Sequence, residues 1–115
     1  MIQWHSNLKI FLGVEPVDLR KSFNGLSYEI SNKLKQDANS GAFFVFSNKG
    51  RNKLKIYYFD GTGIWIFAKR LEKGRFSWPK ASHEGNKINL TPDALQLLLS
   101  GIDMRNACRK AWYEV

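Results

Sequence analysis

The stretch Lys53–Lys69, KLKIYYFDGTGIWIFAK, constrains the fold most, because it joins two β-strand patterns through one tight turn. β-Branched and aromatic residues fill the segments 53–59 and 64–69, and Asp60–Gly63 has the composition of a hairpin turn. Apolar or aromatic side chains occur on both faces of this hairpin, and lysines lie among the aromatic residues. Such a sheet must be covered on both faces, or must use one face for binding.

Alternation along each strand sorts these side chains into two sets, because successive residues of a strand point to opposite faces. One set is aliphatic, apart from Tyr58, and the other combines aromatic residues with lysines. We expect the aliphatic sets of both strands to pack on a helix. The mixed set is then predicted to be exposed or to lie at an interface.

The remaining elements predict an α+β domain with an antiparallel sheet of about five strands. Apolar runs at 8–12 and 42–46 and a short segment at 87–90 are predicted strands, and 42–69 forms a central meander. Apolar residues at helical spacing, with Asp18 as the expected N-cap, predict one long N-terminal helix over about 18–36. Thr91-Pro92-Asp93 begins a short C-terminal helix, over about 92–101.

The length of 115 residues fits one domain, expected over 1–104, followed by a basic and aromatic tail at 105–115 that is expected to be mobile. No apolar run approaches the roughly 18 residues that cross a bilayer, so no membrane partner is expected. The N-terminus lacks a signal-peptide pattern, and the expected location is the cytoplasm.

The formal net charge of +8 favours nucleic acid or another anionic partner. Half of the 18 Lys and Arg residues lie between Lys49 and Lys80. The alternative is that these cations only decorate solvent-facing positions. The candidate DNA-binding residues are Arg20, Lys21, Lys53, Lys55, Lys69, Arg70, Lys73 and Arg75.

Aromatic side chains beside cations can stack on bases, at about 1–3 kcal/mol per base, while Lys and Arg contact the phosphates. The same aromatic residues are also favoured in protein cores and interfaces. The candidates for stacking or for an interface are Tyr57, Phe59, Trp65, Phe67 and Trp78.

No catalytic site is predicted. Each acidic candidate for a metal site has an ordinary structural explanation, such as the hairpin turn for Asp60. Nothing places a nucleophile beside a base, and the single cysteine, Cys108, cannot form an internal disulfide. We therefore expect a non-enzymatic protein without a metal or a cofactor.

Four motifs, in order along the chain, resemble one known family. They are DLRKSFNGL (18–26), KIYYFDGTGI (55–64), KRLEKGRFSWP (69–79) and LTPDAL (90–95). Together they resemble the accessory protein encoded by the second open reading frame of insertion-sequence-66-type bacterial transposons, often called transposition protein B.

The resemblance implies a protein that assists DNA transposition beside a separate, larger transposase that holds the catalytic residues. The implied partners are DNA and that transposase, and a second copy of the chain is a further candidate. The alternative is a protein-interaction or dimerisation module without direct DNA contact. Within the chain, the resemblance shifts the expected binding surface toward the loop 69–79.

Overall fold

A computed structural model describes residues 8–80 and 86–101. The strands are β1 (Ile10–Gly13), β2 (Phe43–Ser47), β3 (Lys53–Phe59), β4 (Ile64–Arg70) and β5 (Lys87–Leu90). The helices are α1 (Phe23–Asn32) and α2 (Pro92–Leu99). The predicted tail 105–115 lies outside the described residues, as does the end of the predicted domain at 102–104.

The five strands form one mixed sheet in the order β4-β3-β2-β1-β5. The meander β2-β3-β4 is antiparallel, as predicted, and β5 also pairs antiparallel with β1. However, β1 and β2 are parallel, so the prediction of a purely antiparallel sheet is wrong. Parallel neighbours need a crossover connection, and here the chain crosses through α1.

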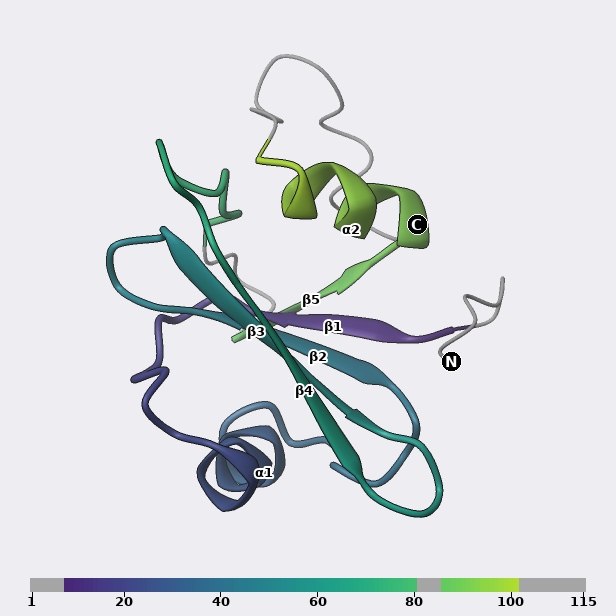
Figure 1. The fold of residues 1–115 in the computed structure, drawn as a ribbon. Coiled ribbons are helices and arrows are strands. Elements are labelled where there is room, and N and C mark those ends of the chain that lie inside the picture. Colours follow the sequence, from purple (N-terminus) through teal and green to yellow (C-terminus); the bar gives the residue numbers. More distant parts are fainter. Residues whose placement is uncertain (1–7, 81–85, 102–115) are drawn as a thin grey trace.

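Each face of the sheet is covered by one helix, with α1 below and α2 above in Figure 1. The α1 face buries a cluster that includes Leu26, Ile30, Phe44 and Tyr57. The α2 face buries a second cluster, whose members from α2 are Ala94, Leu95 and Leu98. All five side chains of β2 are buried, since this strand lies at the centre of both clusters.

The N-terminal helix is shorter than predicted, because its expected N-cap is engaged elsewhere. Asp18 binds Arg20, and Lys21 N–H donates to the Asp18 carbonyl in a turn that precedes the helix. The first helical hydrogen bond runs from Leu26 N–H to the Ser22 carbonyl. Phe23, one of the apolar residues whose helical spacing predicted this helix, is 48% exposed at the helix start.

The same helix ends early at its other terminus. Lys35 has a φ of 57°, a left-handed conformation that stops the helix, and Gln36 N–H closes back on the Ile30 carbonyl. By contrast, α2 begins as predicted: the Thr91 hydroxyl accepts from Ala94 N–H at 3.1 Å, and Pro92 is the first helical residue. Its regular part ends at Leu99, short of the predicted 101.

The expected division of the hairpin faces is wrong. Phe59 pairs with Ile64 across the turn, so Tyr57 is paired with Ile66 and Ile56 with Phe67. Directly paired residues share a face, and the aliphatic set of one strand therefore lies beside the aromatic set of the other. Tyr57 is fully buried under α1, whereas Leu54 and Ile56 lie in the α2 cluster.

We predict that Phe44→Ala lowers the free energy of unfolding by about 3–5 kcal/mol, because it empties a fully buried site between Phe11 and Tyr57. Tyr28→Ala, at a helix position that is 59% exposed, is the control and should change stability by less than about 0.5 kcal/mol. Urea denaturation measures both values. Similar losses in the two variants would contradict the assignment of the core.

Candidate nucleic-acid interface

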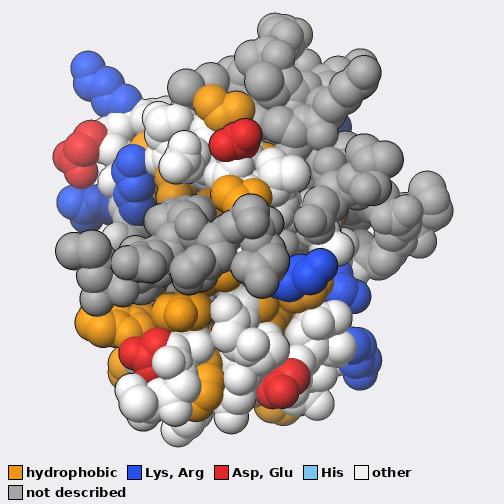
Figure 2. Space-filling view, turned by 90° about the vertical axis from the view of Figure 1, so that its right-hand side faces the viewer, with side chains coloured by type: hydrophobic (Ala, Val, Ile, Leu, Met, Phe, Trp, Pro, Cys, Tyr) orange, Lys and Arg blue, Asp and Glu red, His pale blue; other side chains and the backbone are white. Residues whose placement is uncertain are grey.

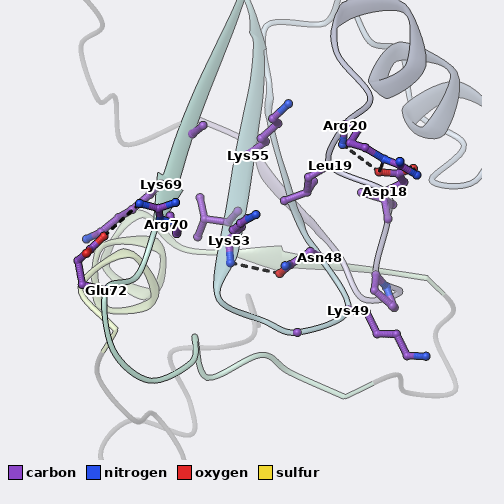
Figure 3. Close-up of a pocket in the computed structure, with 15 residues that line it drawn as sticks. Asp18, Leu19, Arg20, Asn48, Lys49, Lys53, Lys55, Lys69, Arg70 and Glu72 are labelled. Atoms are coloured by element: carbon purple, nitrogen blue, oxygen red, sulfur yellow. Dashed lines mark hydrogen bonds and ion pairs between the residues drawn. The ribbon is translucent and has the colours of Figure 1, made fainter.

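An open groove of about 970 Å³ lies at the end of the sheet where β1 and β2 both finish. Because the two strands are parallel, the loops that follow them meet at this end. The groove is shown in Figure 3. It is lined by Pro16–Arg20 after β1, Asn48–Gly50 after β2, the start of β3 (53–55), the end of β4 (68–70) and Glu72.

The groove is strongly basic. Six of its lining residues are cations, and each of its two carboxylates is paired with one of the arginines. Asp18 contacts Arg20 at 2.8 Å, and Glu72 contacts Arg70 at 3.6 Å. The cations are Arg20, Lys49, Lys53, Lys55, Lys69 and Arg70.

The sheet presents these cations from two faces. Lys53 is the register partner of Arg70, and Lys55 is the partner of Ala68, so these side chains share the α1 face. Lys55 Nζ donates to the Lys21 carbonyl at 3.1 Å. Lys69 comes from the opposite face, where its Nζ donates to the Leu99 carbonyl at 2.7 Å and thereby caps the end of α2. Lys53 and Arg70 are thus the most available cations of the groove floor.

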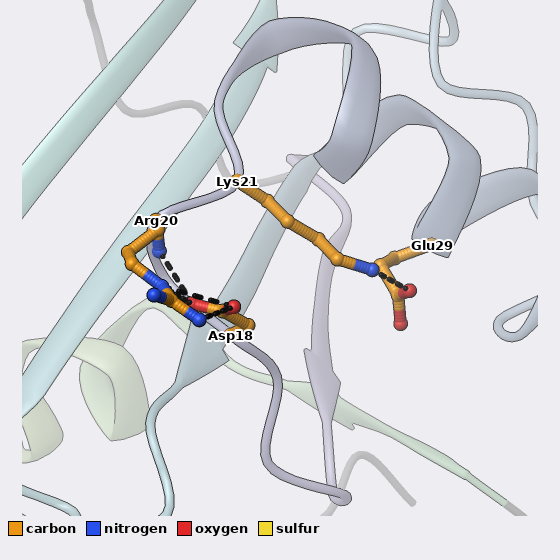
Figure 4. Close-up of polar contacts among 4 residues, drawn as sticks. All are labelled: Asp18, Arg20, Lys21 and Glu29. Atoms are coloured by element: carbon orange, nitrogen blue, oxygen red, sulfur yellow. Dashed lines mark hydrogen bonds and ion pairs between the residues drawn. The ribbon is translucent and has the colours of Figure 1, made fainter.

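Arg20 is held in place by Asp18 in a forked ion pair (Figure 4). The Arg20 Nε and terminal nitrogen donate to both carboxylate oxygens at 2.8–3.1 Å, and the Arg20 backbone N–H donates to one of them. These hydrogen bonds lower the pKa of Asp18 to about 2 and raise the pKa of Arg20. The Arg20 side chain remains 92% exposed, so the loop presents its ion-paired guanidinium to solvent.

Lys21, also predicted to bind DNA, has a structural partner. Its Nζ donates to Glu29 of α1 at 2.8 Å, and this hydrogen bond raises the pKa of Lys21 (Figure 4). The Glu29 side chain is 3% exposed, and Lys33 approaches its other oxygen at 3.6 Å. A buried carboxylate needs such partners, so Lys21 fixes the crossover to α1 and is absent from the groove lining.

Gly25 provides the space for this ion pair. A Cβ at Gly25 would lie 2.8 Å from Cβ of Lys21, closer than nonbonded carbons approach. A glycine within a helix costs about 1 kcal/mol relative to alanine, and here the close approach of Lys21 explains it.

Lys73 and Arg75 do not line the groove, although both are exposed in the loop after β4. Arg75 instead lines a separate hollow of about 720 Å³, which also contains Arg51 and Trp78. The loop is tied back to the turn before β3, because Phe76 N–H donates to the Arg51 carbonyl at 2.7 Å.

Trp78 packs against the body of the protein. Its indole N–H donates to the Gly13 carbonyl at 3.0 Å, and the Arg51 guanidinium lies over its ring at 5.2 Å. Arg51 also donates to the Val14 carbonyl, and its partial burial lowers its pKa. This part of the 69–79 motif thus stabilises the end of β1.

The five predicted aromatic residues do not form one surface. Tyr57 is buried and Phe59 half-buried on the α1 face, and Trp78 lies near the end of β1. Trp65 and Phe67 stack at 5.9 Å on the opposite face, where Trp65 is 49% exposed. A single stacking platform with the lysines is therefore absent among the described residues.

Lys49 is a groove cation that was missing from the predicted set. Its signal in the sequence was its position directly after the buried run that forms β2, in the turn Asn48–Gly50. Recognising the parallel pairing of β1 and β2 would have placed this turn beside the Pro16–Arg20 segment.

Asp60 is committed to the hairpin turn. Its carboxylate accepts from the Thr62 backbone and hydroxyl, the Gly63 N–H and the Trp65 indole, at 2.8–2.9 Å. These donors hold the pKa of Asp60 well below its usual range.

Across residues 8–80 and 86–101, no three His, Cys, Asp or Glu side chains gather in a way that could hold a metal ion. Neither described helix is long and apolar enough to cross a membrane.

Comparison with known proteins identifies the family. The model of the family described as IS66 Orf2 like protein matches residues 8–109. The chain belongs to this family. Two similar proteins come from Sinorhizobium fredii (strain NBRC 101917 / NGR234): uncharacterized protein y4hO is 37% identical over 92% of this chain and 90% of its own length. Uncharacterized protein y4jC is 33% identical over 96% of this chain and 92% of its own length. No solved structure matches the chain.

Membership in the IS66 Orf2-like family implies an accessory role in transposition. It also confirms the resemblance found in the four sequence motifs. In the structure, the first motif forms one wall of the groove and the start of α1, and the third contributes Lys69, Arg70 and Glu72 to its lining.

We predict that Asp18→Asn makes the protein less stable at neutral pH and has no effect at low pH. The folded-state pKa of Asp18 is lowered from 3.8 to about 2, so its contribution is complete above about pH 4 and disappears as the pH falls to about 2. Urea unfolding at several pH values would show the difference between the two proteins shrinking over this range. A difference that is constant down to pH 2 would contradict the ion pair.

We also predict that Gly25→Ala destabilises the protein by about 1 kcal/mol or more, although alanine is favoured over glycine within helices. The added methyl group must displace Lys21 at its Cβ and so weakens the contact with Glu29. Gly63→Ala is the control, since nothing lies within 4 Å of its added Cβ, and its effect should be within about 0.5 kcal/mol. Equal effects in thermal unfolding would refute the steric role of Gly25.

Proposed function

We propose that this IS66 Orf2-like protein assists transposition by binding the phosphate backbone of DNA in the groove between the β1–α1 connection, the 48–50 turn and the β3–β4 strands. The single observation that carries the proposal is the convergence of five cations from four segments of the chain on one open hollow, namely Arg20, Lys49, Lys53, Lys55 and Arg70. Such a surface matches the negative charge of a nucleic-acid backbone and needs no base contacts.

The cations differ in what they can contribute. Lys53 and Arg70 lie side by side on the floor, and Lys49 and Arg20 project from the two loops that form the walls. Arg20 keeps its position through Asp18, which reduces the conformational entropy that a contact with phosphate would cost. Lys55 and Lys69 already donate to backbone carbonyls, so they add positive potential more than direct contacts.

The proposed activity is non-catalytic, in line with the accessory role that the family implies. The element's transposase remains a predicted second partner. The loop cations Lys73 and Arg75 are exposed outside the groove, and we assign them to weaker, peripheral contacts with the same DNA.

Salt-dependent DNA binding tests this proposal. The double variant Lys53→Ala/Arg70→Ala should bind duplex DNA more weakly, and the slope of log K against log salt should become shallower by about 2, since each lost phosphate contact in a duplex changes it by about 0.9. The weakening should be similar for unrelated DNA sequences. Fluorescence anisotropy from 50 to 200 mM salt would measure both effects.

The matched control removes the same charge away from the groove. Lys9 precedes β1 at the end of the sheet opposite the groove, and Lys87 lies opposite Gly13 on the far edge strand β5, outside the groove lining. Lys9→Ala/Lys87→Ala should leave the salt slope nearly unchanged. If the two double variants behave alike, binding follows net charge and the groove is not the site. If the wild-type protein does not bind DNA at 50 mM salt, the alternative of a pure protein-interaction module is favoured.

A further inference from the structure

The strand β4 forms one edge of the sheet. Among the described residues it pairs with β3 alone, and its seven residues are half-buried or exposed. In Figure 1 it lies in front of the other strands, with α1 below and α2 above. An edge strand offers unpaired backbone groups to another chain.

The hydrogen-bond pattern shows which backbone groups are free. Asp60 N–H donates to the Gly63 carbonyl at 3.0 Å, and Leu71 N–H donates to the Asn52 carbonyl at 2.8 Å. Bonded pairs recur at every second residue of an antiparallel ladder, so those of β4 between these two are Trp65, Phe67 and Lys69. The N–H and carbonyl groups of the alternate residues therefore point away from β3, namely those of Ile64, Ile66, Ala68 and Arg70.

This edge is protected at one end only. Lys69 and Arg70 place two cations at its C-terminal end, a common protection against strand pairing. Its other half, Ile64–Phe67, has neither charge nor proline, and Trp65 is 49% exposed there. Figure 2 views the side from which the hairpin turn projects, and hydrophobic side chains remain exposed on its lower part.

We propose that β4 pairs antiparallel with β4 of a second copy of the chain, about a two-fold axis through Phe67, to form a continuous ten-stranded sheet. In this register Ile64 lies opposite Arg70 of the partner, and Ile66 lies opposite Ala68. All four residues with outward backbone groups are then hydrogen-bonded in both copies. The strand length and the positions of the free groups thus fit a second copy of the same strand.

The side chains are complementary in the same register. Trp65 lies opposite Lys69 of the other copy, and Phe67 lies opposite itself. The Trp65 indole N–H donates to Asp60 at 2.8 Å. Each Lys69 ammonium group therefore meets the Trp65 ring of the other copy with the Asp60 carboxylate beside that ring. The cations of the two strands lie at opposite ends of the interface. A shift by two residues toward the C-terminal end would put Lys69 opposite Phe67, and Trp65 would lie opposite Leu71, beyond the end of β4, without a cation.

Such a dimer would unite the proposed DNA-binding grooves, a consequence that rests on the proposed function. A two-fold axis between antiparallel edge strands is perpendicular to the sheet, so both α1 faces lie on one side. The two Arg70 residues, six positions apart in register, would be separated by about 20 Å along the strands. One face of the dimer would then present two basic grooves related by symmetry.

Cysteine cross-linking tests the register directly. In a chain with Cys108→Ser, the variant Phe67→Cys should form a disulfide dimer under mild oxidation, because paired residues of adjacent strands lie within disulfide distance. Lys69→Cys alone should not cross-link, whereas a mixture of Trp65→Cys and Lys69→Cys chains should. Two results would overturn the proposed pairing. One is a disulfide dimer of Lys69→Cys chains alone, and the other is the absence of a disulfide dimer both with Phe67→Cys and in the mixture.

Sedimentation without DNA provides the second measurement and is independent of groove function. At roughly 0.1 mM, where a micromolar Kd gives mostly dimer, the wild-type mass should be twice that of the 13.3 kDa chain. Ala68→Pro removes an outward N–H that β3 does not use, and should weaken dimerisation at least tenfold. Lys69→Glu should do the same by placing a carboxylate near Asp60 of the partner.

Lys73→Glu makes the same charge change outside the strand and is the matched control. It should alter the dimerisation constant less than threefold. A wild-type monomer, or a dimer that both strand variants leave intact, would refute the proposal, whatever the DNA-binding result.

Discussion

The complete burial of β2 is the constraint on which the rest of the structure depends. A strand with no solvent-facing side chain requires a cover on both faces of the sheet, and this small chain supplies one helix for each. The first cover, α1, is inserted between β1 and β2 and makes them parallel. Two loops of different origin then meet at one end of the sheet, where they form the basic groove. The groove is therefore a consequence of how the core is covered.

The sequence predicted the elements better than their arrangement. Local signals were sufficient for β3, β5 and the start of α2, because turn chemistry and the Thr91-Pro92 cap act over a few residues. The direction of β1 depends on contacts with residues more than thirty positions away, which no local pattern encodes. The hairpin faces were predictable in principle. A four-residue turn that connects Phe59 to Ile64 pairs odd-numbered residues of β3 with even-numbered residues of β4, and paired residues share a face.

The candidate site was predicted as a list of cations, and the structure divides that list by local partners. Lys21 neutralises a buried carboxylate, and Lys55 and Lys69 tie separate segments together. Net charge could indicate an anionic partner, but it could not distinguish a cation that holds the fold from one that faces solvent. The same holds for Trp78 and Arg51, which support each other at the end of β1.

The position of β1 between β2 and β5 has a consequence for synthesis on the ribosome. Among the described strands, β1 comes first in the chain and is flanked by β2 and β5, and the Trp78 indole reaches back to Gly13. Until residues 87–90 have left the exit tunnel, one side of β1 has no strand beside it. The nascent chain therefore carries β1 with one unpaired side while β2, β3 and β4 are made, and this side is covered only after β5 has emerged.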